Sequence, residues 1–241
     1  MRPKPYIGIT GFINSAEVLS VLNSVPQQSN RLIMVGVLAS SNTIKGIPNK
    51  WPNRYPSPDQ IGNIFQNHPL ALNLIHYNTK EPETLFEQMK DIRKLAGPHC
   101  HGFQLNIAWP DPRVLARFAM HARRTVIVLQ IGSHAFEMIG YSPETLADKV
   151  AQEYAGLIDY ILLDPSGGHG KPFDTEIARS YLNALASKDL KLGLVVAGGL
   201  SPSTLHLVAP LVSQFPDLSI DAEGKLRDKE DPDVVTFVTL M

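Results

Sequence analysis

The sequence lacks several features, and each absence excludes a class of protein. It has one cysteine, Cys100, so no disulfide can form within the chain, and a reducing compartment is indicated. No apolar run approaches the roughly 20 residues that span a bilayer. The apolar run near the N-terminus is also too short for a signal peptide. We therefore expect a cytoplasmic protein with no membrane partner.

An excess of charge of one sign is also missing. Lysine and arginine number 22, aspartate and glutamate 23, and the formal net charge is −1. Non-specific nucleic-acid binding relies on a basic field, so no nucleic-acid partner is expected. No Gly-x-Gly-x-x-Gly follows the first predicted strand, which weakens a dinucleotide-binding interpretation. We expect no cofactor.

Short apolar segments are present and recur along the whole chain, with helical patterns between them. Each is apolar on both faces, as in parallel strands that are covered on both sides. The predicted strands are 6–10, 32–38, 70–77, 102–107, 126–131, 160–163, 192–197 and 218–220.

The predicted helix starts share one signature, an N-capping side chain followed by proline at the first helical position. It occurs at Ser57-Pro58, Asp111-Pro112, Ser142-Pro143, Ser201-Pro202 and Asp231-Pro232. The separations of 54, 31, 59 and 30 residues correspond to two, one, two and one units of about 30 residues, the size of a βα unit. Asp174 and either Asn14 or Ser15 can cap helices in the gaps.

Eight βα units in 241 residues predict an α/β fold, a closed (β/α)8 TIM barrel forming one domain over residues 1–241. An open doubly wound sheet is the alternative, but nothing marks a reversal of strand order. The polar segment 39–58 follows the second strand, which places it on the catalytic face as a lid or an ordered loop.

Polar residues at the carboxyl ends of barrel strands form the site, and Asp164 is the best candidate among them. It ends the apolar strand 160–163, and a glycine-rich loop and a helix start follow it. Partial burial would raise its pKa toward use as a general acid. The alternative is that it caps a helix or bonds a neighbouring loop. Gln130, His134, Asp221 and Glu223 are further polar residues at strand ends.

Glycine pairs follow the sixth and seventh strands, at Gly167-Gly168 and Gly198-Gly199. Their backbone N–H groups can close on an anion, and barrels often bind phosphate after strands seven and eight. The alternative for the second pair is a tight turn that needs positive φ.

Two histidine-containing features are weaker candidates. His76, near the end of the third strand, is either a base or a hydrogen-bonded core histidine. The sequence His99-Cys100-His101 looks like a metal cluster but precedes a strand, on the stability face of a barrel. Adjacent residues also do not easily converge on one tetrahedral metal, so we expect no metal site.

Several motifs, in the same order along most of the chain, resemble those of one family, the phosphoribosylanthranilate isomerases of tryptophan biosynthesis. Leu162-Leu163-Asp164 and the loop 167–174 are similar to its Leu-Leu-Asp and Gly-Ser-Gly-x-Gly-Lys-x-Phe-Asp. The other similar segments are Ile9-Thr10-Gly11, Asn53-Arg54-Tyr55-Pro56-Ser57-Pro58, Gln104-Leu105 and Ala197-Gly198-Gly199-Leu200-Ser201-Pro202.

This resemblance implies a barrel of the ribulose-phosphate-binding type and an Amadori isomerisation of a phosphoribosylamine. It implies that Asp164 protonates the ring oxygen of the sugar, and that Arg54, Gln104 and Asn106 contact the substrate. The glycines that it implies in phosphate binding are Gly167, Gly168, Gly198, Gly199 and Gly224.

The sequence departs from the family at three of these positions. Thr10 stands in place of the catalytic cysteine and Asn106 in place of a histidine, and Glu223 falls where the family has serine. The threonine hydroxyl is too weakly acidic to replace a thiolate, so His76 or a water on Thr10 is the candidate base. Glu223 would repel a phosphate unless Lys225 or Arg227 compensates.

Three hypotheses stay open. The leading one is an isomerase of the family type that has changed its base. The second is a diverged barrel enzyme that acts on another phosphorylated sugar or small anion and keeps Asp164 as acid. The third is a non-catalytic binder of a phosphorylated ligand. In each case the expected partner is a small phosphorylated sugar, and the protein is a monomer or a homodimer.

Overall fold

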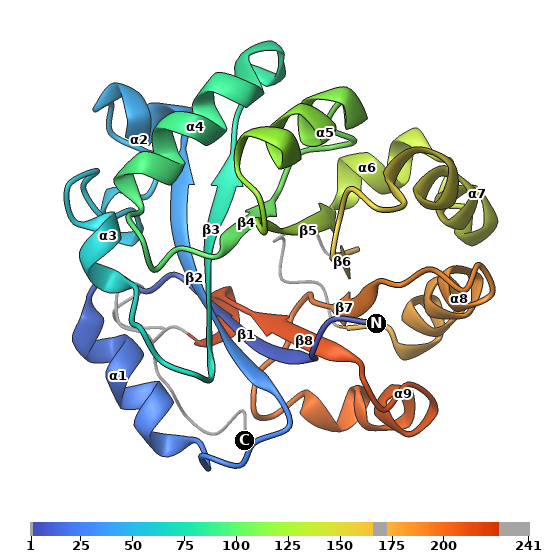
Figure 1. Ribbon diagram of the computed structural model, residues 1–241. Coiled ribbons are helices and arrows are strands. Elements are labelled where there is room, and N and C mark those ends of the chain that lie inside the picture. Colours follow the sequence, from blue (N-terminus) through green and yellow to red (C-terminus); the bar gives the residue numbers. More distant parts are fainter. Residues whose placement is uncertain (1, 166–172, 227–241) are drawn as a thin grey trace.

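The computed structural model describes residues 2–165 and 173–226, and these form a closed barrel of parallel strands surrounded by helices (Figure 1). Each strand pairs with the next, and β8 pairs with β1, with Ile7 opposite Ile220. The strands are β1 Tyr6–Thr10, β2 Leu32–Ser40, β3 Ala71–Asn78, β4 Gly102–Leu105, β5 Val126–Ile131, β6 Tyr160–Leu163, β7 Gly193–Val196 and β8 Ser219–Ala222.

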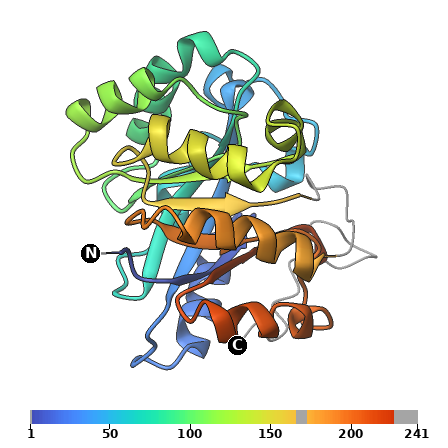
Figure 2. The ribbon, with the colours of Figure 1, turned by 90° about the vertical axis from the view of Figure 1, so that its right-hand side faces the viewer.

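Helices follow the strands around the outside of the barrel (Figure 2). The α-helices are α1 Ser15–Ser24, α2 Ser41–Lys45, α3 Ile61–Ile64, α4 Leu85–Leu95, α5 Pro112–His121, α6 Ser133–Met138, α7 Pro143–Lys149, α8 Thr175–Ala186 and α9 Ala209–Gln214. Short helices of other types are η1 Pro52–Arg54, η2 Pro82–Thr84, η3 Val150–Tyr154, η4 Leu205–Leu207 and η5 Gly224–Leu226. None of the helices in the described part of the chain has the length and apolarity to cross a bilayer.

The predicted barrel is confirmed, including all of its strands. The bounds of β1, β5 and β6 are as predicted, and the others shift by one or two residues at their ends. Four predicted N-caps are also found. Asn14 accepts a hydrogen bond from the backbone N–H of Glu17 and Asp111 from that of Arg113. Ser142 accepts from the backbone N–H of Thr145, and Asp174 from those of Glu176 and Ile177.

Two predicted Ser-Pro helix starts are wrong. After Ser57, the helix α3 begins only at Ile61, without a side-chain cap. At Ser201 the chain makes a turn instead, because its backbone N–H donates to the hydroxyl of Thr204, which in turn donates to the carbonyl of Gly199. The pair Asp231-Pro232 lies outside the described residues.

The segment 39–58 is more ordered than a plain loop. β2 continues to Ser40, whose hydroxyl caps α2 by accepting from the backbone N–H groups of Asn42 and Thr43. Gly46 ends this helix in the left-handed region, with φ 66°. The short helix η1 then brings Arg54 toward the barrel mouth.

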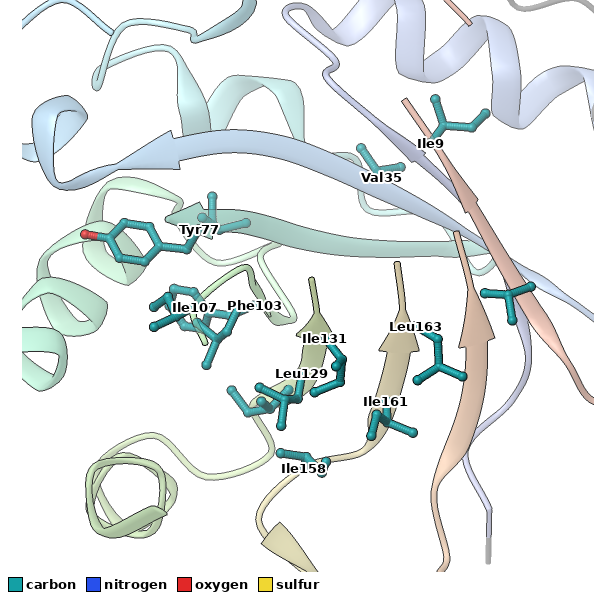
Figure 3. Packing of buried hydrophobic residues seen from close by; sticks show 14 of the residues in the cluster. Ile9, Val35, Tyr77, Phe103, Ile107, Leu129, Ile131, Ile158, Ile161 and Leu163 are labelled. Carbon is teal, nitrogen blue, oxygen red and sulfur yellow. The ribbon is translucent and has the colours of Figure 1, made fainter. Parts of the chain in front are cut away.

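Two apolar layers hold the barrel together, because successive strand residues face opposite sides of the sheet. Inside the barrel, Tyr6, Met34, Leu74 and Leu162 belong to one buried cluster. The larger cluster lies between the strands and the helices, and Figure 3 shows part of it. Its members there include Ile9, Val35, Tyr77, Phe103, Leu129, Ile131, Ile161 and Leu163.

Candidate functional site

The layer of side chains at the carboxyl ends of the strands is polar, although it is buried. Each of its members exposes 8% or less of its surface. They are Thr10, His76, Gln104, Gln130, Asp164 and Asp221, from six different strands or strand ends. Buried polar groups are costly unless they bond one another, and these do.

Two glutamine amides connect the two carboxyl groups of this layer. Gln104 Nε2 donates to Asp221 Oδ2 at 2.9 Å and to Gln130 Oε1 at 3.1 Å. Gln130 Nε2 then donates to Asp164 Oδ2 at 3.2 Å. Because β4 and β8 are not neighbours in the barrel, the bond from Gln104 to Asp221 crosses its interior. Both carboxyl groups therefore face the barrel axis.

Glycines provide the space for this layer on the first two strands. A Cβ atom at Gly8 would lie 2.7 Å from Asp221 Oδ1, and one at Gly36 would lie 2.5 Å from Thr10 Oγ1. Real Cβ atoms do not approach other atoms so closely. Gly8 and Gly36 therefore make space for the side chains of Asp221 and Thr10, respectively.

Asp221 is buried without a cationic partner among the described residues. Burial raises the pKa of its carboxyl group to about 7, and the negative charge of Asp164 adds to the rise. The hydrogen bonds from Gln104, Ala222 and Thr10 favour the ionised form and oppose this shift. Near neutral pH, Asp221 is therefore present in both protonated and ionised forms.

His76 is neutral at physiological pH. Burial, followed by the positive charge of Arg54, lowers its pKa to about 4. Its Nδ1 lies 3.5 Å from Gln104 Nε2, whose two hydrogens already go to Asp221 and Gln130, so this contact does not assign the tautomer of the imidazole. His76 lines the cleft and remains a candidate site residue, with an imidazole that is uncharged.

Arg54 forms an ion pair with Glu223, between the segment after β2 and the end of β8. Both side chains are partly exposed, 22% and 28% respectively. The sequence left Lys225 and Arg227 as the residues that could compensate Glu223. Arg54 does so instead, and Arg227 lies outside the described residues.

A cleft of about 680 Å³ opens beside this layer. Its walls include His76, Asn78, Asn106, Gln130, Asp164 and Glu223, with Lys80 and His134 farther along. A volume of this size suits a small-molecule ligand.

The cleft brings together some of the predicted site residues and leaves others out. Asp164, His76 and Asn106 line it, whereas Thr10 and Gln104 lie in the buried layer below. Of the predicted phosphate-binding glycines, Gly198, Gly199 and Gly224 are not among the lining residues, and Gly167 and Gly168 lie outside the described residues. Gly198 and Gly199 have φ of 106° and 64°, as the alternative of a tight turn requires.

Sequence reasoning placed Gln130 and Asp221 at strand ends but gave them no role. One signal was available for Asp221. It lies two residues after Ser219 on the same face of a short strand, and the pairing strand offers a glycine, Gly8, opposite it. An acidic residue paired with a glycine on the neighbouring strand indicates that its side chain lies inside the barrel, in the space that the glycine leaves free.

The sequence His99-Cys100-His101 precedes β4, at the opposite end of the barrel, as predicted. Burial raises the pKa of the Cys100 thiol to about 11, and His101 Nδ1 accepts the backbone N–H of Asn73. Within residues 2–165 and 173–226, no group of three or more His, Cys, Asp or Glu side chains is arranged to hold a metal ion.

Comparisons with known proteins show the fold. No protein-family model matches the sequence, and no curated protein matches it either. Among solved structures, the barrel is similar to phosphoribosyl anthranilate isomerase from Thermococcus kodakaraensis, with a TM-score of 0.59 and 14% identity over 95% of this chain and 93% of that chain.

Two other solved structures share the architecture. One is fructose-bisphosphate aldolase from Campylobacter jejuni, with a TM-score of 0.54 and 14% identity over 91% of this chain and 71% of that one. The other is the carboxyl transferase domain of Rhizobium etli pyruvate carboxylase, with a TM-score of 0.56 and 9% identity over 92% of this chain and 40% of that chain. At these identities the similarity shows the TIM-barrel fold alone.

Proposed function

We propose that this protein is a diverged isomerase of the phosphoribosylanthranilate isomerase type, with Asp164 as the general acid. The observation that carries the proposal is the position of Asp164. It follows β6 at the carboxyl end of the barrel, lines the cleft, and has Oδ2 held by Gln130 Nε2 at 3.2 Å. A carboxyl group fixed at the boundary between a buried layer and a ligand cleft is suited to proton transfer.

The chemistry follows from such an acid. Protonation of the ring oxygen of a phosphorylated aminosugar breaks its bond to C1′ and leaves a Schiff base. Loss of the C2′ proton then gives an enolamine, which becomes the ketone. The neutral imidazole of His76 and the amide of Asn106 are on the cleft wall and can bond the sugar hydroxyls.

Two further observations support this proposal. The motifs around Arg54, Asp164 and Gly198 are in the family's order, and a phosphoribosyl anthranilate isomerase shares the barrel over nearly the whole of both chains. We infer that the ligand is a small phosphorylated sugar.

The test is direct turnover of N-(5′-phosphoribosyl)anthranilate by the purified protein, followed by the fluorescence change on isomerisation. Asp164→Asn is expected to lower the rate by about 10²–10⁴-fold, the usual effect of losing a general acid. Asp159→Asn is the matched control, since Asp159 lies before β6 at the other end of the barrel, and it is expected to keep the rate. Full activity in Asp164→Asn would refute the acid role.

The Arg54–Glu223 ion pair favours a second candidate, the same chemistry on a different phosphorylated aminosugar. Glu223 offsets the one positive charge that the resemblance places against the substrate. A substrate with an uncharged group on nitrogen would suit this arrangement better than one with an additional carboxylate. Turnover of a phosphoribosylamine with a neutral aromatic group, compared with the anthranilate, separates the two candidates.

A further inference from the structure

The proposed reaction needs a group that removes the C2′ proton, and the residues considered so far do not provide it. The hydroxyl of Thr10 is far too weakly acidic to be present as an alkoxide. Burial lowers the pKa of His76 to about 4, so its imidazole is a much weaker base than the carboxylate of Asp221, whose pKa is about 7. The carboxyl group of Asp221 is the remaining acid–base group of the polar layer.

Asp221 occupies the corner of the barrel in which the resemblance places the family's base. β8 pairs with β1, with Asp221 opposite Gly8, and Asp221 Oδ1 lies 3.5 Å from Thr10 Oγ1. Thr10 stands at the position of the family's cysteine. The carboxylate is therefore beside the position of the missing thiolate, on the neighbouring strand.

Asp164 is close enough to interact electrostatically with Asp221. Its negative charge raises the pKa of the Asp221 carboxyl group. Between them in the barrel lies β7, which ends before the small residue Ala197, a member of the interior cluster. Two carboxyl groups flank a position with no large side chain, an arrangement in which one gives a proton to a ligand while the other takes one.

We propose that Asp221 is the general base of this site and the replacement for the family's cysteine. The inference rests on the proposed function. The two carboxyl groups share one proton. In the reactive form it is on Asp164, which gives it to the ring oxygen as the bond from that oxygen to C1′ breaks. Asp221 takes the proton from C2′, and the electron pair of that C–H bond forms the enolamine double bond. In the return step Asp221 gives its proton to C1′ and the C2′ hydroxyl releases its proton to solvent, so that the ketone forms. Asp164 regains its proton from solvent.

Access to Asp221 is controlled by the Arg54–Glu223 pair. Glu223 follows directly after β8, on the cleft side of Asp221. Glu223 lines the cleft, while Asp221 is only 4% exposed below it. A phosphorylated ligand that attracts the guanidinium of Arg54 would draw it from Glu223 and open the way to Asp221.

The groups around Asp221 explain why the pKa of its carboxyl group is raised. They are the hydroxyls of Thr10 and Tyr6, the amide of Gln104 and the carboxylate of Asp164, with Glu223 above. None of these is cationic. A carboxyl group with a pKa of about 7 is a far better proton acceptor at physiological pH than an exposed aspartate.

The experiment measures proton abstraction apart from ring opening. The probe is 1-phenylamino-1-deoxyribulose 5-phosphate, whose C1 hydrogens exchange with D2O when a base removes them, and exchange is followed by NMR. The protein is expected to catalyse this exchange. Asp221→Asn is expected to slow it at least 100-fold, and Asp159→Asn to leave it unchanged. Circular dichroism verifies that Asp221→Asn is folded.

Asp164→Asn separates the inference from the proposed function. This variant is expected to retain exchange while losing isomerisation of the closed-ring substrate. The exchange rate is expected to rise with pH around a midpoint near 7 in the wild-type protein, and at lower pH in Asp164→Asn, because the like charge is gone. A merely structural role of Asp221 would not move that midpoint.

Each outcome decides one of the two claims. Exchange in Asp221→Asn within a few-fold of the wild-type rate, or no exchange in the wild-type protein, overturns Asp221 as the base. Exchange that depends on Asp221, in a protein that isomerises no phosphoribosylamine, supports the base and removes the proposed function.

Discussion

Replacing Asp221 by asparagine is expected to stabilise the protein at alkaline pH and to leave its stability at acidic pH nearly unchanged. The native pKa of Asp221 is about 7, against 3.8 for a free aspartate, because burial and the charge of Asp164 disfavour ionisation. Between these values the native state binds more protons than the unfolded state. The free energy of unfolding therefore falls as pH rises from about 4 to 7, and the loss is complete above the native pKa.

The magnitude follows from the difference of about 3 pKa units. At about 1.4 kcal/mol per unit, ionised Asp221 costs the native state about 4 kcal/mol. Asparagine has no charge to bury, and its Oδ1 can still accept the hydrogen bond of Gln104 Nε2. The variant is therefore expected to exceed the wild-type protein by up to about 4 kcal/mol at pH 8 and to match it at pH 4.

Urea unfolding at a series of pH values from 4 to 8 measures this difference. Asp217→Asn, at an exposed position, serves as the control and is expected to change the stability little at either end of the range. If the stability curves of Asp221→Asn and the wild-type protein run parallel from pH 4 to 8, Asp221 is not the buried uncompensated carboxyl group inferred above.

Three further substitutions test other parts of the structure. Glu223→Gln is expected to release Arg54 and to lower the Kd for inorganic phosphate at low ionic strength, measured by calorimetry; an unchanged Kd would contradict Arg54 as an anion contact held by Glu223. Gly36→Ala is expected to destabilise the protein by about 1–3 kcal/mol in urea unfolding, since the new Cβ would lie 2.5 Å from Thr10 Oγ1, and wild-type stability would mean that this contact is not as close. Tyr6→Phe is expected to keep or slightly raise the melting temperature, because the buried Tyr6 hydroxyl has no hydrogen-bond partner among the described residues, and a large loss would reveal one.

Much of the fold could be predicted because its signals are local. An apolar run such as 160–163 can be satisfied only in a strand that is covered on both faces, and a capping side chain before proline starts a helix wherever the backbone can follow. The exceptions are Ser57, after which α3 begins only at Ile61, and Ser201, where a nearby group competes for the hydrogen bonds. At Ser201, the competing group is the hydroxyl of Thr204, three residues away.

The candidate site could be predicted only in outline. Since parallel strands in a barrel all end on one rim, the sequence indicated that Asp164, His76 and Asp221 lie on the same rim. Neither the ion pair of Arg54 nor the hydrogen bonds of Asp221 could be read in this way. Arg54 meets Glu223 from a segment far away in the chain, and the phosphate sites predicted from glycine pairs depended on loop positions that local sequence does not set.

The number and order of the strands, several helix starts and the polar residues at the carboxyl end of the barrel could all be read from the sequence. Tertiary structure alone decided which of those residues bond one another and which of them are charged. The pKa of Asp221 depends on its burial, on the carboxylate of Asp164 after β6, and on the amide of Gln104 in β4. These groups meet only when the barrel closes, so no stretch of the chain contains the information about their charge.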